Sequence, residues 1–305
     1  MKKGIYIIVF ILVAGKVSGQ LFPQQSLYFN NPLPLNAGAA GKDDALSISL
    51  SHRTMWRGVE GAPKTQYVCI HTPLKNEQFS VGLQLINDQL GITKRTGLFA
   101  TGAYRIKLSK DYRLSFGLTG GMQTFSNRWS EIETTVQGDQ AFAIADQTYW
   151  LPQIGTGIFL DGKNAFAGIS VPRMLTETYQ GGGKYKAIHT INNYSTHIMG
   201  GYRIMLKNHW YISPSALLKY HPSSAIQTDL TCMLGKKELG EAGLTYRFNQ
   251  SVVGLVQARI NAQLNLGYGF DYLLGGLSQY QNGSHEIMMA YKFIYQNKAP
   301  NPRLF

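Results

Sequence analysis

The chain has 305 residues, of which 15% are charged, and it carries 33 glycines, 18 tyrosines and a formal net charge of +12. Two distant cysteines are too few for a disulfide scaffold and have no metal-ligand spacing. The basic residues are scattered, without a basic helix or an aromatic-basic stacking motif, and this excludes a nucleic-acid-binding protein.

The first 19 residues have the pattern of a secretory signal peptide. Two lysines precede an apolar run from Ile5 to Ala14, and small residues lead up to Gly19. A run of about ten apolar residues is too short to cross a bilayer as a helix. Beyond Gln20 no apolar run is long enough for a transmembrane helix, so a helical membrane protein is excluded.

From residue 45 onward, apolar and polar residues alternate with the period of a β-strand. In QLNLGYGFDY (263–272), Leu266 and Phe270 fall on one face of the strand, and Asn265 and Asp271 fall on the other. The segments TQYVCIH and VVGLVQAR show no clean alternation, so the facing of the second and twelfth predicted strands stays open. The predicted strands lie at 45–54, 64–73, 78–88, 95–108, 111–125, 150–160, 164–172, 194–206, 209–220, 225–235, 239–248, 251–260, 262–273 and 284–295.

The connections between these strands fall into two classes. Those after even-numbered strands are short, whereas several after odd-numbered strands are long and polar, at 126–149, 173–193 and 274–283. A soluble β-sandwich has no reason to sort its loops in this way, but an outer-membrane barrel has short periplasmic turns and longer external loops. The strands also suit a tilted membrane crossing, which takes roughly 9–11 residues.

We therefore predict an all-β fold, a transmembrane outer-membrane β-barrel of about 14 antiparallel strands with up-and-down topology. The predicted organisation is a signal peptide (1–19), an N-terminal periplasmic or lumenal segment (20–44), the barrel (45–295) and a C-terminal tail (296–305). The predicted location is the cell outer membrane.

No residue pattern indicates an enzyme, a metal site or a cofactor site. The seven histidines form no HExxH pair, and no GxSxG element occurs. Ser284, His285 and Glu286 are adjacent, so on a strand their side chains point to opposite faces and cannot form a triad. GLTGG and the GGG at 181–183 lack the strand-to-helix context of a phosphate loop.

Charged residues also fall on the polar faces of the predicted strands. They indicate a paired, water-filled interior, a pore lining or a docking surface for a plug. Besides Glu286, the predicted lumen-facing residues are Arg105, Arg113, Asp229, Arg247, Asp271 and Lys292.

Several motifs resemble the PorP/SprF family of type IX secretion system membrane proteins. They include NNPLPLNAGAAG (30–41), RTMWRGVEGAPKTQ (53–66), LINDQLG (85–91) and GSHEIMMAYKF (283–293). The resemblance implies a non-enzymatic outer-membrane component of the secretion and gliding machinery. It also implies a protein partner, either the C-terminal domain of a secreted adhesin or periplasmic secretion-ring components.

The resemblance transfers no catalytic residues. The sorting of the connections, short after even-numbered strands and long after odd-numbered ones, is called loop parity below. It places the motifs on the external side, where a passenger would dock. An outer-membrane diffusion porin or solute channel, built on the same wall, is the alternative function. The residues that we predict to bind the partner are Trp56, Arg57, Gly61, Pro63, Asn87, Asp88, His285 and Glu286.

Overall fold

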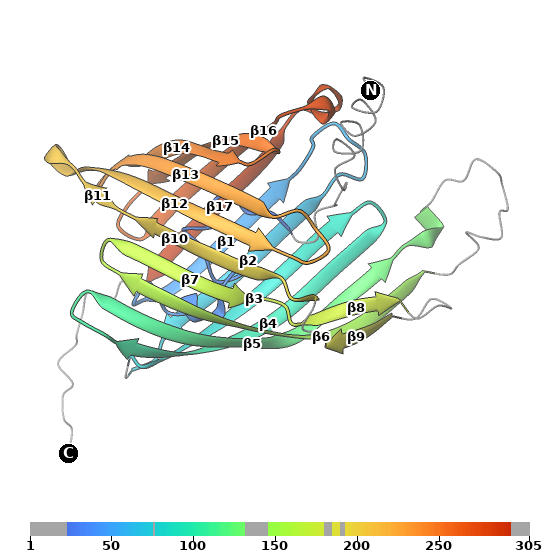
Figure 1. Ribbon diagram of the computed structural model, residues 1–305, viewed down its shortest axis with the longest axis horizontal. Helices are drawn as coiled ribbons and strands as arrows, with labels where there is room; N and C mark the ends of the chain where they lie inside the picture. The colour runs from blue at the N-terminus through green and yellow to red at the C-terminus, as the bar shows by residue number, and fades with distance from the viewer. Residues whose placement is uncertain (1–22, 76, 132–145, 180–184, 190–192, 294–305) are drawn as a thin grey trace, which may run out of the picture.

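The protein is a closed β-barrel in a computed structural model that describes residues 23–75, 77–131, 146–179, 185–189 and 193–293 (Figure 1). The predicted signal peptide (1–19) and the predicted tail (296–305) lie outside the described residues. In the described part of the chain, no helix is both long enough and apolar enough to cross a membrane.

The strands follow the predicted segments closely, except that β8 and β9 lie within the connection predicted at 173–193. They are β1 (Leu46–Thr54), β2 (Lys64–Pro73), β3 (Phe79–Leu90), β4 (Thr93–Lys107), β5 (Tyr112–Asn127), β6 (Gln147–Gly162), β7 (Ala165–Val171), β8 (Leu175–Tyr179), β9 (Tyr185–His189), β10 (Thr196–Tyr202), β11 (Ile204–Met205), β12 (Trp210–Tyr220), β13 (Gln227–Lys236), β14 (Gly240–Arg247), β15 (Ser251–Arg259), β16 (Leu264–Leu273) and β17 (Ser284–Phe293).

The main sheet closes on itself, because β10 pairs with both β7 and β12. It has 15 strands, of which β11 is only a two-residue piece after β10, so 14 strands form the wall. Strands β8 and β9 form a separate hairpin beside β6 at one end of the barrel (Figure 1). The predicted barrel of about 14 antiparallel strands is therefore confirmed.

The wall separates an apolar outer face from a polar inner face. In β16, Leu266 and Phe270 are exposed on the outside, whereas Asp271 is buried on the inside. Outward-facing leucines, isoleucines and aromatics repeat this pattern in the other strands, as expected where lipid contacts the wall. Short turns join the strands at the left-hand end of Figure 1, which by loop parity is the periplasmic end.

An arginine on the outer face should be far more costly than one on the inner face of the same strand. At the membrane midplane, Leu266→Arg is expected to lower the free energy of unfolding by about 2–4 kcal/mol. Asn265→Arg should cost little, because this side chain lines a polar cavity inside the barrel. Urea titration followed by heat-modifiable gel mobility would compare the two variants, and equal losses would contradict this facing.

Strands β3 and β4 are longer than predicted. They run on to Leu90 and from Thr93, so only Gly91 and Ile92 form the turn. Asn87 and Asp88, at the end of the predicted strand, are followed by two further residues of β3 and pair with Thr96 and Arg95 of β4. Polar side chains extend the ladder here: the Thr65 hydroxyl donates to Asp88 (2.6 Å), and Asn87 donates to Gln66 (3.2 Å).

This polar extension lies beyond the apolar belt of the outer face. Along β3, the exposed Val81, Leu83 and Leu85 precede Asn87 and Gln89 on the same face. Because a polar outer face suits water rather than lipid, this end of the wall projects from the membrane. The projection explains why both strands continue past the predicted membrane crossing.

The hydrophobic core lies in the lumen, between the wall and residues 23–44, which we call the lumenal segment. The segment contributes Leu27, Tyr28, Leu33, Leu35 and Ala39 to three buried clusters, each completed by inward side chains of the wall. A 14-stranded barrel is wider than the eight-stranded barrels that side chains alone can fill. The lumenal segment fills this additional space.

The same packing shows which side chains point inward in the two strands for which the sequence left the facing open. In β15, Val253 and Leu255 point inward and are buried, packed in the cluster that contains Leu27. In β2, Cys69 points inward into the cluster of Leu33. Both inner faces are apolar because they meet apolar residues of the lumenal segment, and this removes the alternation.

Candidate functional site

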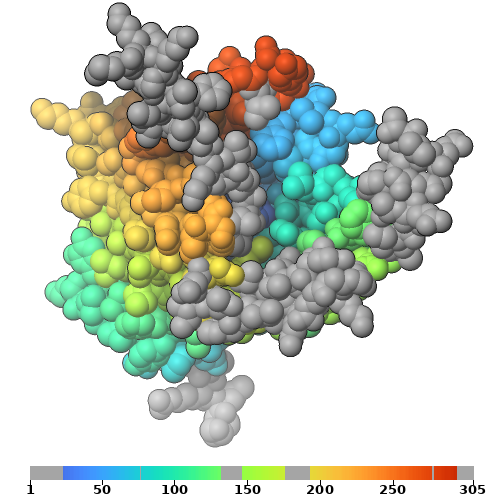
Figure 2. Space-filling view, turned by 45° about the vertical axis from the view of Figure 1, so that its right-hand side comes forward, coloured from blue at the N-terminus to red at the C-terminus, as the bar shows by residue number. Residues whose placement is uncertain are grey.

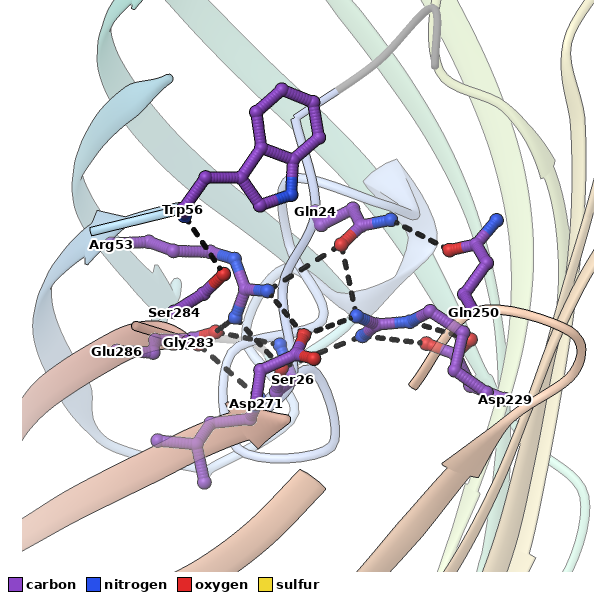
Figure 3. A network of polar contacts seen from close by, with 12 residues as sticks. Gln24, Ser26, Arg53, Trp56, Asp229, Gln250, Asp271, Gly283, Ser284 and Glu286 are labelled. Carbon is purple, nitrogen blue, oxygen red and sulfur yellow. Dashed lines mark hydrogen bonds and ion pairs between the residues drawn. The ribbon is translucent and has the colours of Figure 1, made fainter. Parts of the chain in front are cut away.

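A buried network of ionised side chains lies inside the barrel near the long-loop end (Figure 3). Asp271 accepts from Arg53 and Arg247, each at 2.6 Å, while Arg247 also binds Asp229 (3.0 Å) and Arg53 also binds Glu286 (3.0 Å). All five side chains are at most 3% exposed. Removing one partner from such a network leaves an uncompensated buried charge.

This network holds the beginning of the lumenal segment. The Glu286 carboxylate accepts hydrogen bonds from the backbone N–H groups of Ser26 (2.7 Å) and Leu27 (3.2 Å). Arg247 donates to the side-chain oxygen of Gln24 (2.9 Å). The wall thus supplies both charge and geometry to fix the beginning of the lumenal segment in the lumen.

A second attachment lies midway along the lumen. The Asn36 amide donates to the backbone oxygens of Ile158 on β6 (2.9 Å) and Ile169 on β7 (3.3 Å). Gly157 makes room for this side chain, since a Cβ there would lie 2.1 Å from the Asn36 oxygen. A larger residue at position 157 would therefore displace the lumenal segment, although the strand itself does not need glycine there.

The lumenal segment ends in ion pairs at the short-turn end. Asp43 binds Lys292 (2.7 Å) and Lys42 (3.2 Å). Burial of this carboxyl would by itself raise its pKa, but the two ammonium groups outweigh burial and hold the pKa well below its usual range. Asp43 therefore stays ionised at neutral pH, and its attraction for Lys292 ties the segment to β17.

Asp44 makes a separate attachment to β4 and β5. Its carboxylate accepts from Arg105 (2.7 Å) and from Arg113, which also binds Asp161 on β6 (3.1 Å). Partial burial opposes ionisation of Asp44, but the two guanidinium groups lower its pKa below the usual value. Both ends of the lumenal segment are thus bound to the wall by charged groups.

The predicted lumen-facing residues all lie on the inner side of the wall. Arg247, Lys292, Arg105 and Arg113 contact the lumenal segment directly, and Asp229 and Asp271 pair with Arg247. The sequence did not single out Gln24, Ser26, Asn36 or Arg53. Of these, Asn36 lies within the motif NNPLPLNAGAAG (30–41) and Arg53 begins the motif RTMWRGVEGAPKTQ (53–66), whereas no motif contains Gln24 or Ser26.

At the long-loop end, three separate stretches of chain form one surface, which we call the outer rim: the β1–β2 loop (55–63), the β3–β4 turn (91–92) and the β16–β17 loop (274–283). The Arg57 N–H donates to Gly283 O (2.8 Å), and the Asn282 N–H donates to Arg57 O (2.7 Å). On the other side, the Gly91 N–H donates to Gly61 O (2.7 Å). Figure 2 shows the β1–β2 loop (light blue) beside the β16–β17 loop (red).

Gly61 and Gly91 allow the close approach within the outer rim. Their φ angles are +68° and +55°, in the left-handed region that favours glycine. A Cβ on Gly61 would lie 3.2 Å from the Cα of Gly91. Pro63 follows at the entry to β2, where its ring fixes φ.

Trp56 covers the buried network on its outer side (Figure 3). Its backbone N–H donates to the Ser284 hydroxyl (3.1 Å), and its own φ is +46°. A cavity of about 250 Å³ lies beneath, lined by Trp56, Gln24, Arg247 and Leu274 among others. Next to it Arg57, Gly58, Val59 and Glu60 are exposed on the outer rim.

The predicted partner-binding residues do not share one environment. Trp56, Arg57, Gly61 and Pro63 belong to the β1–β2 loop of the outer rim, and Asn87 and Asp88 lie just below it in β3. His285 points outward, where it contacts Tyr268 (2.7 Å). Glu286 is buried in the network and holds the lumenal segment, so its carboxylate is not presented to an external partner.

In the described ranges no three or more histidine, cysteine, aspartate or glutamate side chains are grouped to hold a metal ion. The charged groups of the buried network are engaged with one another or with the lumenal segment, as are Asp43 and Lys292. Their arrangement fixes the lumenal segment inside the barrel, and at the long-loop end the outer rim is the surface open to a partner.

Comparison with known proteins gives a family and a fold. Residues 17–291 match the family described as type IX secretion system membrane protein PorP/SprF. No curated protein sequence matches the chain. Two similar solved structures are the toluene transporter TbuX of Ralstonia pickettii (7% identity, TM-score 0.50, 86% of this chain and 93% of that chain) and the monoaromatic hydrocarbon channel CymD (7%, 0.51, 92% and 96%). At such identity the likeness concerns the outer-membrane barrel fold alone.

Proposed function

The chain belongs to the PorP/SprF family of type IX secretion system membrane proteins, and from this premise we propose that it is a non-enzymatic outer-membrane component that docks a secreted adhesin through the adhesin's C-terminal domain. The observation that carries the proposal is the occupied lumen. The lumenal segment is bound to the wall by ionised groups at both ends, so it obstructs the path that a solute would take through the barrel.

The outer rim is the surface that we assign to docking. Its three stretches of chain are joined by backbone hydrogen bonds, so the surface is preorganised, and a partner loses little free energy in ordering it. Trp56 and Arg57 are residue types enriched at binding hot spots. The cavity beneath Trp56 could accept one apolar or polar side chain of the adhesin domain.

A diffusion porin or solute channel is the alternative. It requires a water-filled path along the lumen, whereas Leu27, Leu33 and Tyr28 pack there against the wall. Membrane conductance separates the two functions, because a docking barrel with a filled lumen should carry no steady ionic current.

Removing Trp56 and Arg57 together should abolish docking but spare the barrel. The double variant Trp56→Ala, Arg57→Ala keeps all strands and the buried network, so its heat-modifiable gel mobility should match the wild type. Loss of two hot-spot residues costs about 2 kcal/mol or more each, so recovery of the adhesin in pull-downs from solubilised outer membranes should fall at least tenfold.

The matched control is Arg128→Ala, Trp150→Ala. It removes the same residue types at the long-loop end of the barrel but outside the outer rim, from two exposed positions. It should leave both adhesin recovery and surface display unchanged. Normal recovery with the outer-rim variant, or equal loss with the control, would rule out the outer rim as the docking site.

A further inference from the structure

A second, separate cavity lies inside the barrel at the short-turn end, on the far side of the lumenal segment from the outer rim. Its volume is about 320 Å³, which falls within the range of ligand sites, roughly 300–1,000 Å³. Phe29 and Asn30 of the lumenal segment form its inner boundary, and residues of β6, β7, β10 and β12–β17 form its walls. We call this cavity the vestibule.

The vestibule is basic. Five cationic side chains line it against two acidic ones, and these charged residues are Lys42, Lys163, Arg203, Arg259, Lys292, Asp161 and Glu241. Lys42 and Lys292 are engaged with Asp43. Lys163, Arg203 and Arg259 are exposed to the solvent at this end, and within the described residues none of them lies at ion-pair distance from a carboxylate. Glu241 interacts electrostatically with Arg203 and Arg259. One carboxylate offsets the charge of three cations only in part, so the vestibule keeps an excess of positive charge.

Hydrogen-bonding capacity is also available on the vestibule wall. Within the described part of the chain, Asn30 Nδ2, Gln257 Nε2 and Glu241 Oε2 are buried and have no hydrogen-bond partner. Two of these atoms donate and one accepts. Such a set matches the alternating carbonyl and N–H groups of a peptide backbone, while the three cations match carboxylate side chains.

Arg203 is fixed in place for such a contact. Its Nε donates to the Ser213 hydroxyl (3.3 Å), and its guanidinium lies over the Tyr211 ring, 4.4 Å from the centroid. These contacts leave the terminal nitrogens of the guanidinium available. Arg259 is held similarly by a hydrogen bond to Lys237 O.

The short turns around the vestibule carry the same sign of charge. Exposed lysines occur in or beside five of these turns, namely Lys75, Lys110, Lys163, Lys207 and Lys237. A basic ring around a basic cavity attracts acidic segments and speeds their encounter with the site. Loop parity places this end in the periplasm.

From these observations we infer that the vestibule binds an acidic, extended segment of a periplasmic protein. Its carboxylates pair with Lys163, Arg203 and Arg259, and its backbone bonds to Asn30, Gln257 and Glu241. The site lies opposite the outer rim and does not depend on the docking proposed there. Anionic lipid head groups are the competing source of carboxylate or phosphate charge, but they meet the outside of the wall, whereas the vestibule lies within it.

The test measures binding of a fluorescent hexaglutamate peptide to the purified full-length protein in neutral detergent at low salt. The wild type should bind the peptide, and Arg203→Gln, Arg259→Gln should weaken binding about tenfold. Lys163→Glu, at an exposed turn, should also weaken it, and this variant cannot disturb the wall. Arg128→Gln removes a cation at the opposite end and should leave the affinity unchanged, as should Trp56→Ala, Arg57→Ala.

Two outcomes would overturn the inference. The first is equal peptide affinity for the wild type and all vestibule variants. The second is a loss that appears only for binding to vesicles containing phosphatidylglycerol and not for the peptide, since that would assign the charges to lipid. A loss of adhesin recovery in the outer-rim variant with unchanged peptide affinity would support this site independently of the proposed function.

Discussion

Arg247→Ala is expected to destabilise the barrel by about 3–5 kcal/mol, because it leaves Asp229 and Asp271 buried and without their shared cation. Arg247 is 1% exposed and makes ion pairs with both carboxylates, and it also donates to Gln24 of the lumenal segment. The measurement is the urea midpoint of unfolding in lipid vesicles, followed by heat-modifiable gel mobility.

Arg113→Ala is the matched control at the opposite end of the lumen. Arg113 also bridges two carboxylates, but its side chain is 26% exposed and that of Asp44 is 50% exposed. Water can solvate the carboxylates left behind, so the loss should be within about 1 kcal/mol. A loss for Arg247→Ala no larger than that of the control would show that the buried network contributes little to stability.

The wall of the barrel could be predicted from the sequence because one physical rule governs nearly all of it. A strand between lipid and a polar interior must alternate, and Leu266, Phe270 and Asp271 follow that rule. The rule fails in β2 and β15, where Cys69, Val253 and Leu255 face an apolar partner inside the lumen. Those two strands were ambiguous because the interior that they meet is itself part of the chain.

The lumenal segment was beyond prediction in detail because it has no repeating pattern. Its fixed points are Ser26, Asn36 and Asp43, which bind side chains or backbone groups more than 100 residues away in sequence. Only the closed barrel brings those groups together. The alternatives of a periplasmic or a lumenal segment therefore remained open until the contacts of this segment with Glu286, Ile158 and Lys292 were known.

The outer rim could be predicted only in part, because its contacts also join residues that are far apart in the sequence. Loop parity places the residues of the β1–β2 loop at the outer end, but parity says nothing of which loops touch. Arg57 and Gly283 are joined by a backbone hydrogen bond that no local pattern encodes. Glu286 sits one residue from the outward-facing His285, and that single step in a strand turns its side chain from the outside to the buried network.

Deleting residues 24–40 is expected to convert a non-conducting barrel into an ion-conducting one. The deletion removes Leu27, Leu33 and Asn36, which pack or bind across the lumen, but it keeps all 14 wall strands and the ion pairs of Arg53 and Arg247 with the wall. The measurement is ionic current across a planar bilayer containing the purified protein. The wild type should show no steady current, and the deletion variant should show discrete open steps.

Gly157→Val provides a milder variant in case the deletion prevents assembly. Its side chain would occupy the position of the Asn36 amide, and the bonds from that amide to Ile158 and Ile169 would be lost. The two charged ends would still hold the lumenal segment, so brief openings rather than a permanent channel are expected. Gly102→Val, at a site with open space around it, should stay closed.

Steady current through the wild type would favour the porin or solute channel over docking, because the lumen would then conduct with its segment in place. Absence of current from a folded deletion variant would show that inward side chains alone close the barrel. The expected pattern requires both a silent wild type and a conducting deletion variant. Only this pattern assigns closure to the lumenal segment, since 14 strands enclose more space than their own side chains fill.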